Sequence, residues 1–257
     1  MNEDKLLLAQ AEDLISRCNR QDIPVCSEFL DAREQSMLRR NFGSSRGDVS
    51  IFYYGGHQDA DRVVMVCLPY YMDNEKDADM FLSAIRATVP KNSAASRSGR
   101  ALSHSDYLGA IMGLGIRRSV IGDILVGDDG ADIIVLKDMA EYLLQNLTGA
   151  GKAHISTEEI SLQELRIPAA DITEFTDTVA SLRLDAVLAS AFRMSRGKAA
   201  EAIRQGLVFV DHLEATRTDM NITEGMELVI RHMGKAKLVQ VGRRTRKERI
   251  SITIARW

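Results

Sequence analysis

The chain has 257 residues, 45% of them hydrophobic and 27% charged, with only 4 prolines, a composition that excludes a disordered or fibrous chain. Its net charge of −3 hides an asymmetry, because residues 181–257 carry 15 basic and 8 acidic side chains, net +7, whereas the remainder carries net −10. The length exceeds one usual domain, no apolar run approaches the roughly 18 residues that span a bilayer, and the N-terminus lacks the layout of a signal peptide, so we expect several folding units in a cytoplasmic protein without a membrane partner.

The first part of the chain predicts a small α+β domain over residues 1–75. Apolar spacing indicates two amphipathic helices, from Glu3 to about Arg17 and from Glu28 to about Arg40. Two runs rich in β-branched and aromatic residues, Val49 to Tyr54 and Arg62 to Leu68, follow on either side of a turn-rich segment. These runs predict two strands.

Residues 76–165 predict the order β-α-β-β-α-β of a ferredoxin-like, RRM-like domain. The elements are an extended run Met80–Val89, a helix that Ser103 and Asp106 begin and Gly113 and Gly115 end, strands Ile121–Val126 and Ala131–Leu136, a helix Asp138–Leu147 and a strand Lys152–Ser156. The central run ADIIVLK contains no aromatic side chain on which a base could stack. RNA binding through this sheet face is therefore not expected, and the topology alone does not establish function.

The third domain is expected over residues 181–257, after an acidic, Thr-rich connector that has one strand near Glu159–Leu165. Apolar spacing predicts a helix from Arg183 to Phe192, then a tight turn and a helix from Arg196 to Gln205 that Ser195 caps. The period then changes to two, which predicts a strand-rich remainder interrupted by the basic loop GRRTRKER.

Basic residues concentrate around this predicted helix-turn-helix and indicate a site for a polyanion. Arg183, Arg196 and Lys198 are expected to form one face, because arginine forks onto phosphate oxygens and the helix that starts after Ser195 offers free amides. The alternative is that Arg183 pairs with Asp185 and that Ser195 is merely a cap. Further candidates are Arg193, Arg204, Lys235, Lys237, Arg243 and Arg244, with Arg246 and Lys247 in the same basic run. A charge run can also be an ordinary solvated face.

The same residues resemble the S4 RNA-binding module, with its pattern R-L-D-x-x-L, then S-R-x-x-A-x-x-x-I-x-x-G-x-V-x-V. The matching positions are Arg183, Leu184, Asp185, Leu188, Ser195, Arg196, Ala199, Ile203, Gly206, Val208 and Val210. Two turns depart from the pattern, because Asp211-His212 stands where Asn-Gly is usual and Gly225-Met226 where Gly-Asp is usual. The resemblance implies an S4 (αL-type) domain in an α+β protein of three small domains.

The whole chain also resembles the YlmH-type S4 proteins of bacteria, through the stretch HSDYLGAIMGLGIRRSVIGDILV at residues 104–126. This resemblance implies a ribosome-associated protein that binds rRNA and/or tRNA on the large ribosomal subunit during quality control of stalled translation. From the residues alone, the stretch also has a plain interpretation as a helix start followed by a surface pair, Arg117-Arg118.

Cysteine and histidine spacing give no sign of a metal, cofactor or catalytic site. Cys18, Cys26 and Cys67 are odd in number and lack C-x-x-C spacing, which predicts reduced thiols, and the five histidines are scattered. We expect a monomeric, non-catalytic RNA-binding protein without cofactor or metal. Two other classes stay open: an rRNA- or tRNA-modifying enzyme with an S4 targeting module, and an adaptor whose acidic part binds a protein.

Overall fold

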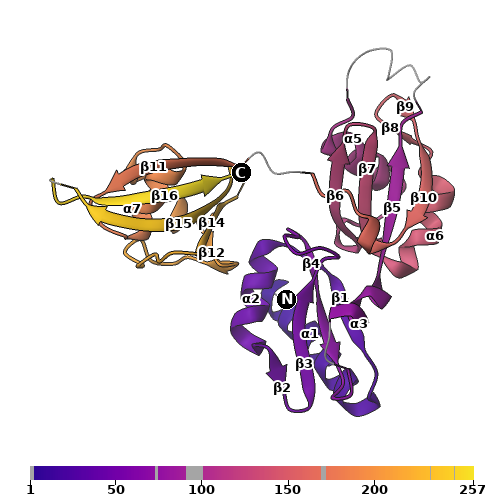
Figure 1. The fold of residues 1–257 in the computed structure, drawn as a ribbon. Helices are drawn as coiled ribbons and strands as arrows, with labels where there is room; N and C mark the ends of the chain where they lie inside the picture. Colours follow the sequence, from indigo (N-terminus) through magenta and orange to yellow (C-terminus); the bar gives the residue numbers. More distant parts are fainter. Residues whose placement is uncertain (1–2, 73–74, 91–100, 169–171, 232, 246) are drawn as a thin grey trace. The chain divides into compact units, whose positions relative to one another are not determined.

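The structure, a computed structural model, describes residues 3–72, 75–90, 101–168, 172–231, 233–245 and 247–257 (Figure 1). The chain divides into two compact units, Met1–Pro168 and Ala169–Trp257. Each combines helices with antiparallel sheet, as the mixed sequence patterns predicted.

The first sheet of the first unit has strand order β1-β4-β3-β2. Its elements are α1 (Glu3–Gln21), β1 (Val25–Leu30), α2 (Ala32–Phe42), β2 (Ser45–Arg46), β3 (Val49–Tyr54) and β4 (Val63–Leu68). All six residues of β4 are buried because the sheet is covered on both faces. Met65 and Cys67 pack with α1 and α2, whereas Val64 and Val66 join a core on the opposite face.

The expected helix from Glu28 is wrong in its first turn. Residues Glu28 to Leu30 belong to β1, which pairs with β4, and α2 begins only after Asp31. The Asp31 carboxylate accepts hydrogen bonds from the backbone N–H groups of Arg33 and Glu34, and Glu34 Oε2 accepts one from the backbone of Asp31 at 2.7 Å. This capping box fixes the start of the helix.

The second sheet of the first unit has strand order β10-β5-β7-β6. Its elements are α3 (Glu75–Ala78), η1 (Asp79–Phe81), β5 (Leu82–Thr88), α5 (His104–Gly113), η2 (Arg118–Val120), β6 (Ile121–Gly127), β7 (Gly130–Leu136), α6 (Lys137–Asn146), β8 (Gly149–Ala150), β9 (Ala153–His154), β10 (Ser156–Ile160) and η3 (Leu162–Glu164). The expected cap of α5 is present, since Asp106 Oδ2 accepts from the backbone N–H of Ser103 at 2.8 Å. The polar, Ser-rich segment PKNSAASRSGR at 90–100, which the sequence indicates is a loop, lies outside the described residues except for Pro90.

The last strand of this sheet differs from the expected Lys152–Ser156. Ala153 and His154 pair with Gly149 and Ala150 in a separate two-stranded ribbon, and the edge strand that pairs with β5 is Ser156–Ile160. The strand expected near Glu159–Leu165 is therefore also displaced, because Leu162–Glu164 form a 3₁₀ turn. Edge strands carry weak local signals, since one side of the backbone and one face are solvated.

The two sheets of the first unit share one hydrophobic core. Ile134 of β7 and Leu82 of β5 pack with Phe29, Val64 and other residues of the first sheet. The approach is close, because a Cβ on Gly122 would lie 2.7 Å from the Phe29 ring. The first sheet thus covers part of the face of the second sheet that lies opposite α5 and α6. The expected domain boundary near residue 75 falls inside one compact unit.

The second unit is a six-stranded sheet of order β11-β16-β15-β14-β12-β13 with two helices on one face. Its elements are β11 (Thr173–Val179), α7 (Leu184–Ala191), α8 (Arg196–Arg204), β12 (Val208–Val210), β13 (Leu213–Glu214), β14 (Glu227–Ile230), β15 (Gly234–Arg244) and β16 (Ile250–Arg256). The interpretation of residues 173–179 as part of a connector is wrong, because all seven pair in register with β16. The unit therefore begins upstream of residue 181.

The three cysteines are free thiols, as expected, and all lie in the first unit. Burial raises the pKa of Cys26 and of Cys67 to about 12, with a smaller contribution from Asp138 at Cys26 and from the other two cysteines at Cys67. These two thiols are therefore protonated at neutral pH and are poor nucleophiles. Among the helices that the structure describes, none is long and apolar enough to cross a membrane.

The turn Asp211-His212 keeps the geometry of the usual Asn-Gly despite the changed residues. Val210 pairs with Leu213, so the loop has two residues, and φ is +46° at Asp211 and +64° at His212. Both central residues of a type I′ turn require positive φ, which glycine adopts most readily.

Replacing His212 with glycine is therefore expected to stabilise the second unit by roughly 0.5–1 kcal/mol, since a non-glycine residue is strained in this region. Urea unfolding of the full chain measures the change. The matched control is Thr216→Gly, an exposed loop position that has no positive φ. Equal effects of the two glycine substitutions would contradict the strain argument.

Candidate nucleic-acid interface

A buried carboxylate joins the two helices of the second unit and holds two arginines. Asp185, in the first turn of α7, is 6% exposed. Arg183 donates to it from Nε at 3.2 Å and from Nη2 at 3.3 Å, and Arg196 from Nε at 2.9 Å and from Nη2 at 3.1 Å. The structure therefore brings Arg183 and Arg196 together, as expected, and also forms the alternative pair of Arg183 with Asp185. The pairing of Arg183 with Asp185 and its proximity to Arg196 thus occur together.

The charges of this trio stabilise each other. Burial alone would raise the pKa of Asp185, but the hydrogen bonds from Arg183 and Arg196 outweigh it and lower that pKa. The hydrogen bond to Asp185, aided by the nearby charge of Asp219, raises the pKa of Arg183. Asp185 is therefore a carboxylate at neutral pH, and the two arginines and one aspartate together carry net charge +1.

The two arginines keep donors free for an anion. Each guanidinium has five N–H groups in a rigid fork, and its Nε and Nη2 edge is turned to Asp185. The side chains of Arg183 and Arg196 remain 41% and 52% exposed. Because the carboxylate holds both arginines by their inner edges, the orientation of their outer edges is fixed before a ligand binds. The two side chains therefore lose less conformational entropy on binding.

The backbone around the trio is fixed by a loop of the same unit. The N–H groups of Leu184 and Asp185 donate to the carbonyls of Met220 and Thr218, at 2.8 Å and 3.1 Å, and thus cap the start of α7. Within this loop Arg217 pairs with Asp219 at 3.1 Å. The position of Arg183 is therefore set by contacts far apart in the sequence.

Ser195 begins α8 as a cap. Its hydroxyl accepts a hydrogen bond from the backbone N–H of Lys198 at 3.2 Å, which is the role that the plain interpretation gives it. Arg196 and Lys198 extend from the first turn of this helix, and both are exposed. The positive end of the helix dipole adds to their charge.

Three of the other expected basic residues lie away from Arg183 and Arg196. Lys235 and Lys237 alternate along β15 with Ala236 and Leu238, which pack against the helices, so the two lysines lie on the opposite face of the sheet. Arg204 pairs with Glu201 at 2.6 Å at the far end of α8. Arg243 and Arg244 lie at the end of β15, and Arg193 lies in the turn between α7 and α8. Arg246 lies outside the described residues.

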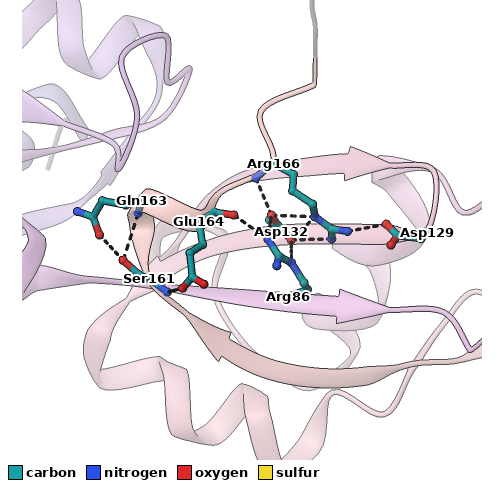
Figure 2. A network of polar contacts seen from close by, with 7 residues as sticks. All are labelled: Arg86, Asp129, Asp132, Ser161, Gln163, Glu164 and Arg166. Carbon is teal, nitrogen blue, oxygen red and sulfur yellow. Dashed lines mark hydrogen bonds and ion pairs between the residues drawn. The ribbon is translucent and has the colours of Figure 1, made fainter.

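The face of the second sheet opposite its helices is closed by ion pairs as well as by the first sheet. Asp132 of β7 is fully buried and accepts hydrogen bonds from Arg86 of β5, at 2.9 Å from Nε, and from Arg166, at 2.8 Å from both its backbone N–H and its Nη2 (Figure 2). Arg166 also pairs with Asp129 at 2.5 Å. These strands thus offer no open surface for stacking a base at Asp132, in agreement with their lack of aromatic residues.

The pair Arg117-Arg118 has mainly structural contacts. Arg117 is exposed and pairs with Glu28 of the first sheet. Arg118 donates to the carbonyls of Ile121 and Gly122, and burial, with the nearby charge of Arg62, lowers its pKa to about 10. The plain interpretation as a surface pair thus fits Arg117, whereas Arg118 is half-buried and holds the backbone of the following strand.

Sequence reasoning missed several side chains next to this site. Phe175 of β11 and Arg256 of β16 lie near the turn between α7 and α8, where Arg193 is over the Phe175 ring and Arg256 over the Phe192 ring. The alternation E-F-T-D-T-V at residues 174–179 was the signal that could have identified β11. Among the described residues, no group of three or more histidine, cysteine, aspartate or glutamate side chains is arranged to hold a metal ion.

The class of protein is one that carries an S4 domain, which lies in the second unit together with Arg183, Asp185 and Arg196. The S4 family model matches residues 182–228, and a model described as a putative RNA-binding domain in YlmH matches residues 96–164. The chain is 35% identical over 230 residues, 90% of its length and 86% of the relative's, to the ribosome-associated protein quality control protein P2 of Bacillus subtilis (strain 168). The chain belongs to the YlmH-type family of S4-domain proteins.

A solved structure, the cell division protein ylmH from Streptococcus pneumoniae, is similar at a TM-score of 0.47 and 18% identity, over 65% of this chain and 96% of that one.

Proposed function

We propose that the chain is a non-catalytic protein that binds structured RNA, rRNA and/or tRNA, through its S4 unit. The observation that carries the proposal is the pair Arg183 and Arg196, which Asp185 orients with their outer edges in solvent. Arginine forks match phosphate oxygens, and neutralised phosphates release counterions, which drives affinity. Lys198 and the start of α8 supply further positive charge at the same place.

The place of action proposed is the large ribosomal subunit, in rescue and quality control of stalled translation, and the compartment is the cytoplasm. The support is the name of the Bacillus subtilis relative, a ribosome-associated protein quality control protein. We further propose that the chain acts as a monomer.

We also propose an RRM-like interpretation of residues 76–165, as one of three small domains, with residues 1–75 before it and the S4 unit, which begins upstream of residue 181, after it. Its support is the element order β5-α5-β6-β7-α6-β10 and the strand order β10-β5-β7-β6. Because Asp132 and Ile134 on the face opposite the helices are fully buried, any RNA contact of this segment would use another surface.

Sedimentation of cell extract through a sucrose gradient, followed by ultraviolet crosslinking of the ribosomal fractions, tests the proposal. We expect the full chain in the large-subunit fractions, with crosslinked rRNA or tRNA attached to peptides from the region 183–198. A chain that stays at the top of the gradient under low salt would contradict the ribosomal role. A missing rRNA or tRNA modification in a deletion strain would instead favour an RNA-modifying enzyme.

A further inference from the structure

A pocket of about 320 Å³ lies in the second unit beside the turn that joins α7 to α8. Its lining residues are Thr173, Phe175, Arg193, Met233, Arg256 and Trp257. Thr173 at the start of β11 pairs with Arg256 at the end of β16, and the backbone of Trp257 exchanges hydrogen bonds of 2.9 and 3.0 Å with Lys235. The pocket is therefore built from both ends of the unit and from the helix turn.

The lining combines flat rings with planar cations. The Arg193 guanidinium is 5.4 Å from the centre of the Phe175 ring, and Trp257 contributes a second aromatic side chain. Arg256 is 5.1 Å from the centre of the Phe192 ring, which fixes the second guanidinium. None of the six lining residues is acidic. Unpaired nucleobases stack on aromatic rings and on arginine planes, and the phosphate beside such a base adds an attraction to the cations.

The backbone at Arg193 is held in a conformation that arginine rarely adopts. Its φ is +50°, and the turn is fixed by hydrogen bonds from Arg193 N–H to the Ser190 carbonyl at 3.2 Å and from Met194 N–H to the Ala189 carbonyl at 3.0 Å. Glycine would fit this conformation at lower cost. An arginine in its place, with its head over Phe175 in a pocket, is the kind of strained position that clusters at ligand sites.

The pocket lies close to the trio of Arg183, Asp185 and Arg196. Arg193 precedes Arg196 by three residues, and Phe192, the C-cap of α7, follows Asp185 by seven residues, which corresponds to a helical rise of about 10 Å. One RNA strand can span this distance with a few nucleotides. A volume near 300 Å³ is at the lower end of the range for small-molecule sites and suits a single nucleotide.

We propose that this pocket holds one unpaired nucleotide of the RNA whose phosphates contact Arg183 and Arg196. Its base lies against Trp257 and against the plane of the Arg193 guanidinium, which covers the Phe175 ring, and Arg256 faces a flanking phosphate. The inference rests on the proposed RNA-binding function and adds a preference for a single-stranded or bulged element over a continuous duplex.

Trp257 is the only tryptophan of the chain, so its fluorescence reports on the pocket directly. The full chain is titrated with a fluorescein-labelled single-stranded oligoribonucleotide and with a blunt duplex of the same length. Two signals are followed in parallel: the emission of the tryptophan and the anisotropy of the fluorescein label. A titration with the unlabelled oligonucleotide corrects the tryptophan emission for energy transfer to the label. We expect saturable quenching of Trp257 by the single strand and little by the duplex.

Arg193→Gly is the informative variant, because glycine suits φ of +50° and the fold is kept while the guanidinium is removed. We expect it to weaken binding of the single strand roughly tenfold and to reduce the quenching. The control is Arg33→Gln, an exposed arginine of the first unit that pairs with Asp4, which should leave both readouts unchanged.

The outcomes separate this inference from the function on which it rests. If Arg183→Gln/Arg196→Gln weakens RNA binding while Trp257 is not quenched and Arg193→Gly binds like the parent, the pocket is overturned and the proposed function stands. Equal quenching by the duplex would also overturn the pocket. If neither oligonucleotide nor ribosomal RNA binds, both proposals fail.

Discussion

Replacing Asp132 with alanine is expected to lower the free energy of unfolding of the first unit by about 3 kcal/mol. The carboxylate is fully buried and takes hydrogen bonds from Arg86 and from both the backbone and side chain of Arg166 (Figure 2). Removing it leaves Arg86 without this carboxylate and Arg166 with Asp129 alone, which costs far more than the loss of an exposed pair. Denaturant unfolding of the full chain measures the change.

The control for this variant is Asp129→Ala. Asp129 pairs with the same Arg166 at 2.5 Å, but its side chain is 62% exposed, so its loss should cost no more than about 1 kcal/mol. If the two alanine variants unfold alike, the buried position of Asp132 does not matter to stability and the account of the closed sheet face is wrong.

The same carboxylate gives stability a dependence on pH. Burial would raise the pKa of Asp132, but hydrogen bonds from Arg86 and Arg166 lower it to about 2. Because the pKa is depressed in the folded state, this contribution is fully present above the unfolded value of about 3.9 and is lost as the pH falls toward 2. The difference in stability between the parent and Asp132→Ala should therefore shrink over that window.

The double variant Arg183→Gln/Arg196→Gln is expected to bind RNA roughly 100-fold more weakly at moderate salt. Hydrogen bonds to charged groups are worth about 1.5 kcal/mol each or more, and 1.4 kcal/mol is a factor of ten in affinity. The two arginines are exposed on their outer edges and fixed by Asp185 on their inner edges. Fluorescence anisotropy of a labelled rRNA fragment measures the affinity.

Two further variants keep this test clear of misfolding. The double variant leaves Asp185 buried without its partners, which destabilises α7, so the triple variant with Asp185→Asn removes the uncompensated charge. We expect the triple variant to regain stability and to stay weak in binding. A triple variant that binds like the parent would show that the arginines act only through folding. Arg33→Gln is again the control, because it removes one exposed arginine of the first unit that pairs with an aspartate.

Most of the second unit could be predicted because its signals are local. The cap at Ser195, the apolar spacing of the two helices and Gly206, whose φ is +69°, define the helix-turn-helix from the residues themselves. The Arg183–Asp185 pair was also foreseen, although as the alternative to a binding role. The structure shows that one carboxylate serves two arginines, which depends on how α7 and α8 pack and is not visible in spacing.

The missed strands depend on partners that are distant in sequence. β11 places Glu174 and Thr176 in solvent and pairs with β16 more than 70 residues later, so its polar composition resembled a connector. The last three residues of β1, Glu28 to Leu30, were taken for the first turn of the following helix. Tertiary pairing decides such segments more than local propensity does.

The closed face of the second sheet could be foreseen only in part. The absence of aromatic residues in β7 indicated that bases do not stack there, but the cover itself comes from remote segments. Arg166 lies 34 residues beyond Asp132, and Phe29 reaches Ile134 from the first sheet. No sequence period records contacts of this kind.

The salt dependence of RNA binding tests the central claim, that Arg183 and Arg196 contact phosphates, most directly. The logarithm of the association constant is plotted against the logarithm of salt concentration for the parent, the triple variant and Arg33→Gln. We expect the slope for the triple variant to be smaller in magnitude than that for the parent by roughly 1.5 to 2. The reason is that each lost phosphate contact reduces the magnitude of the slope by nearly one. Parallel lines for the parent and the triple variant would contradict the claim.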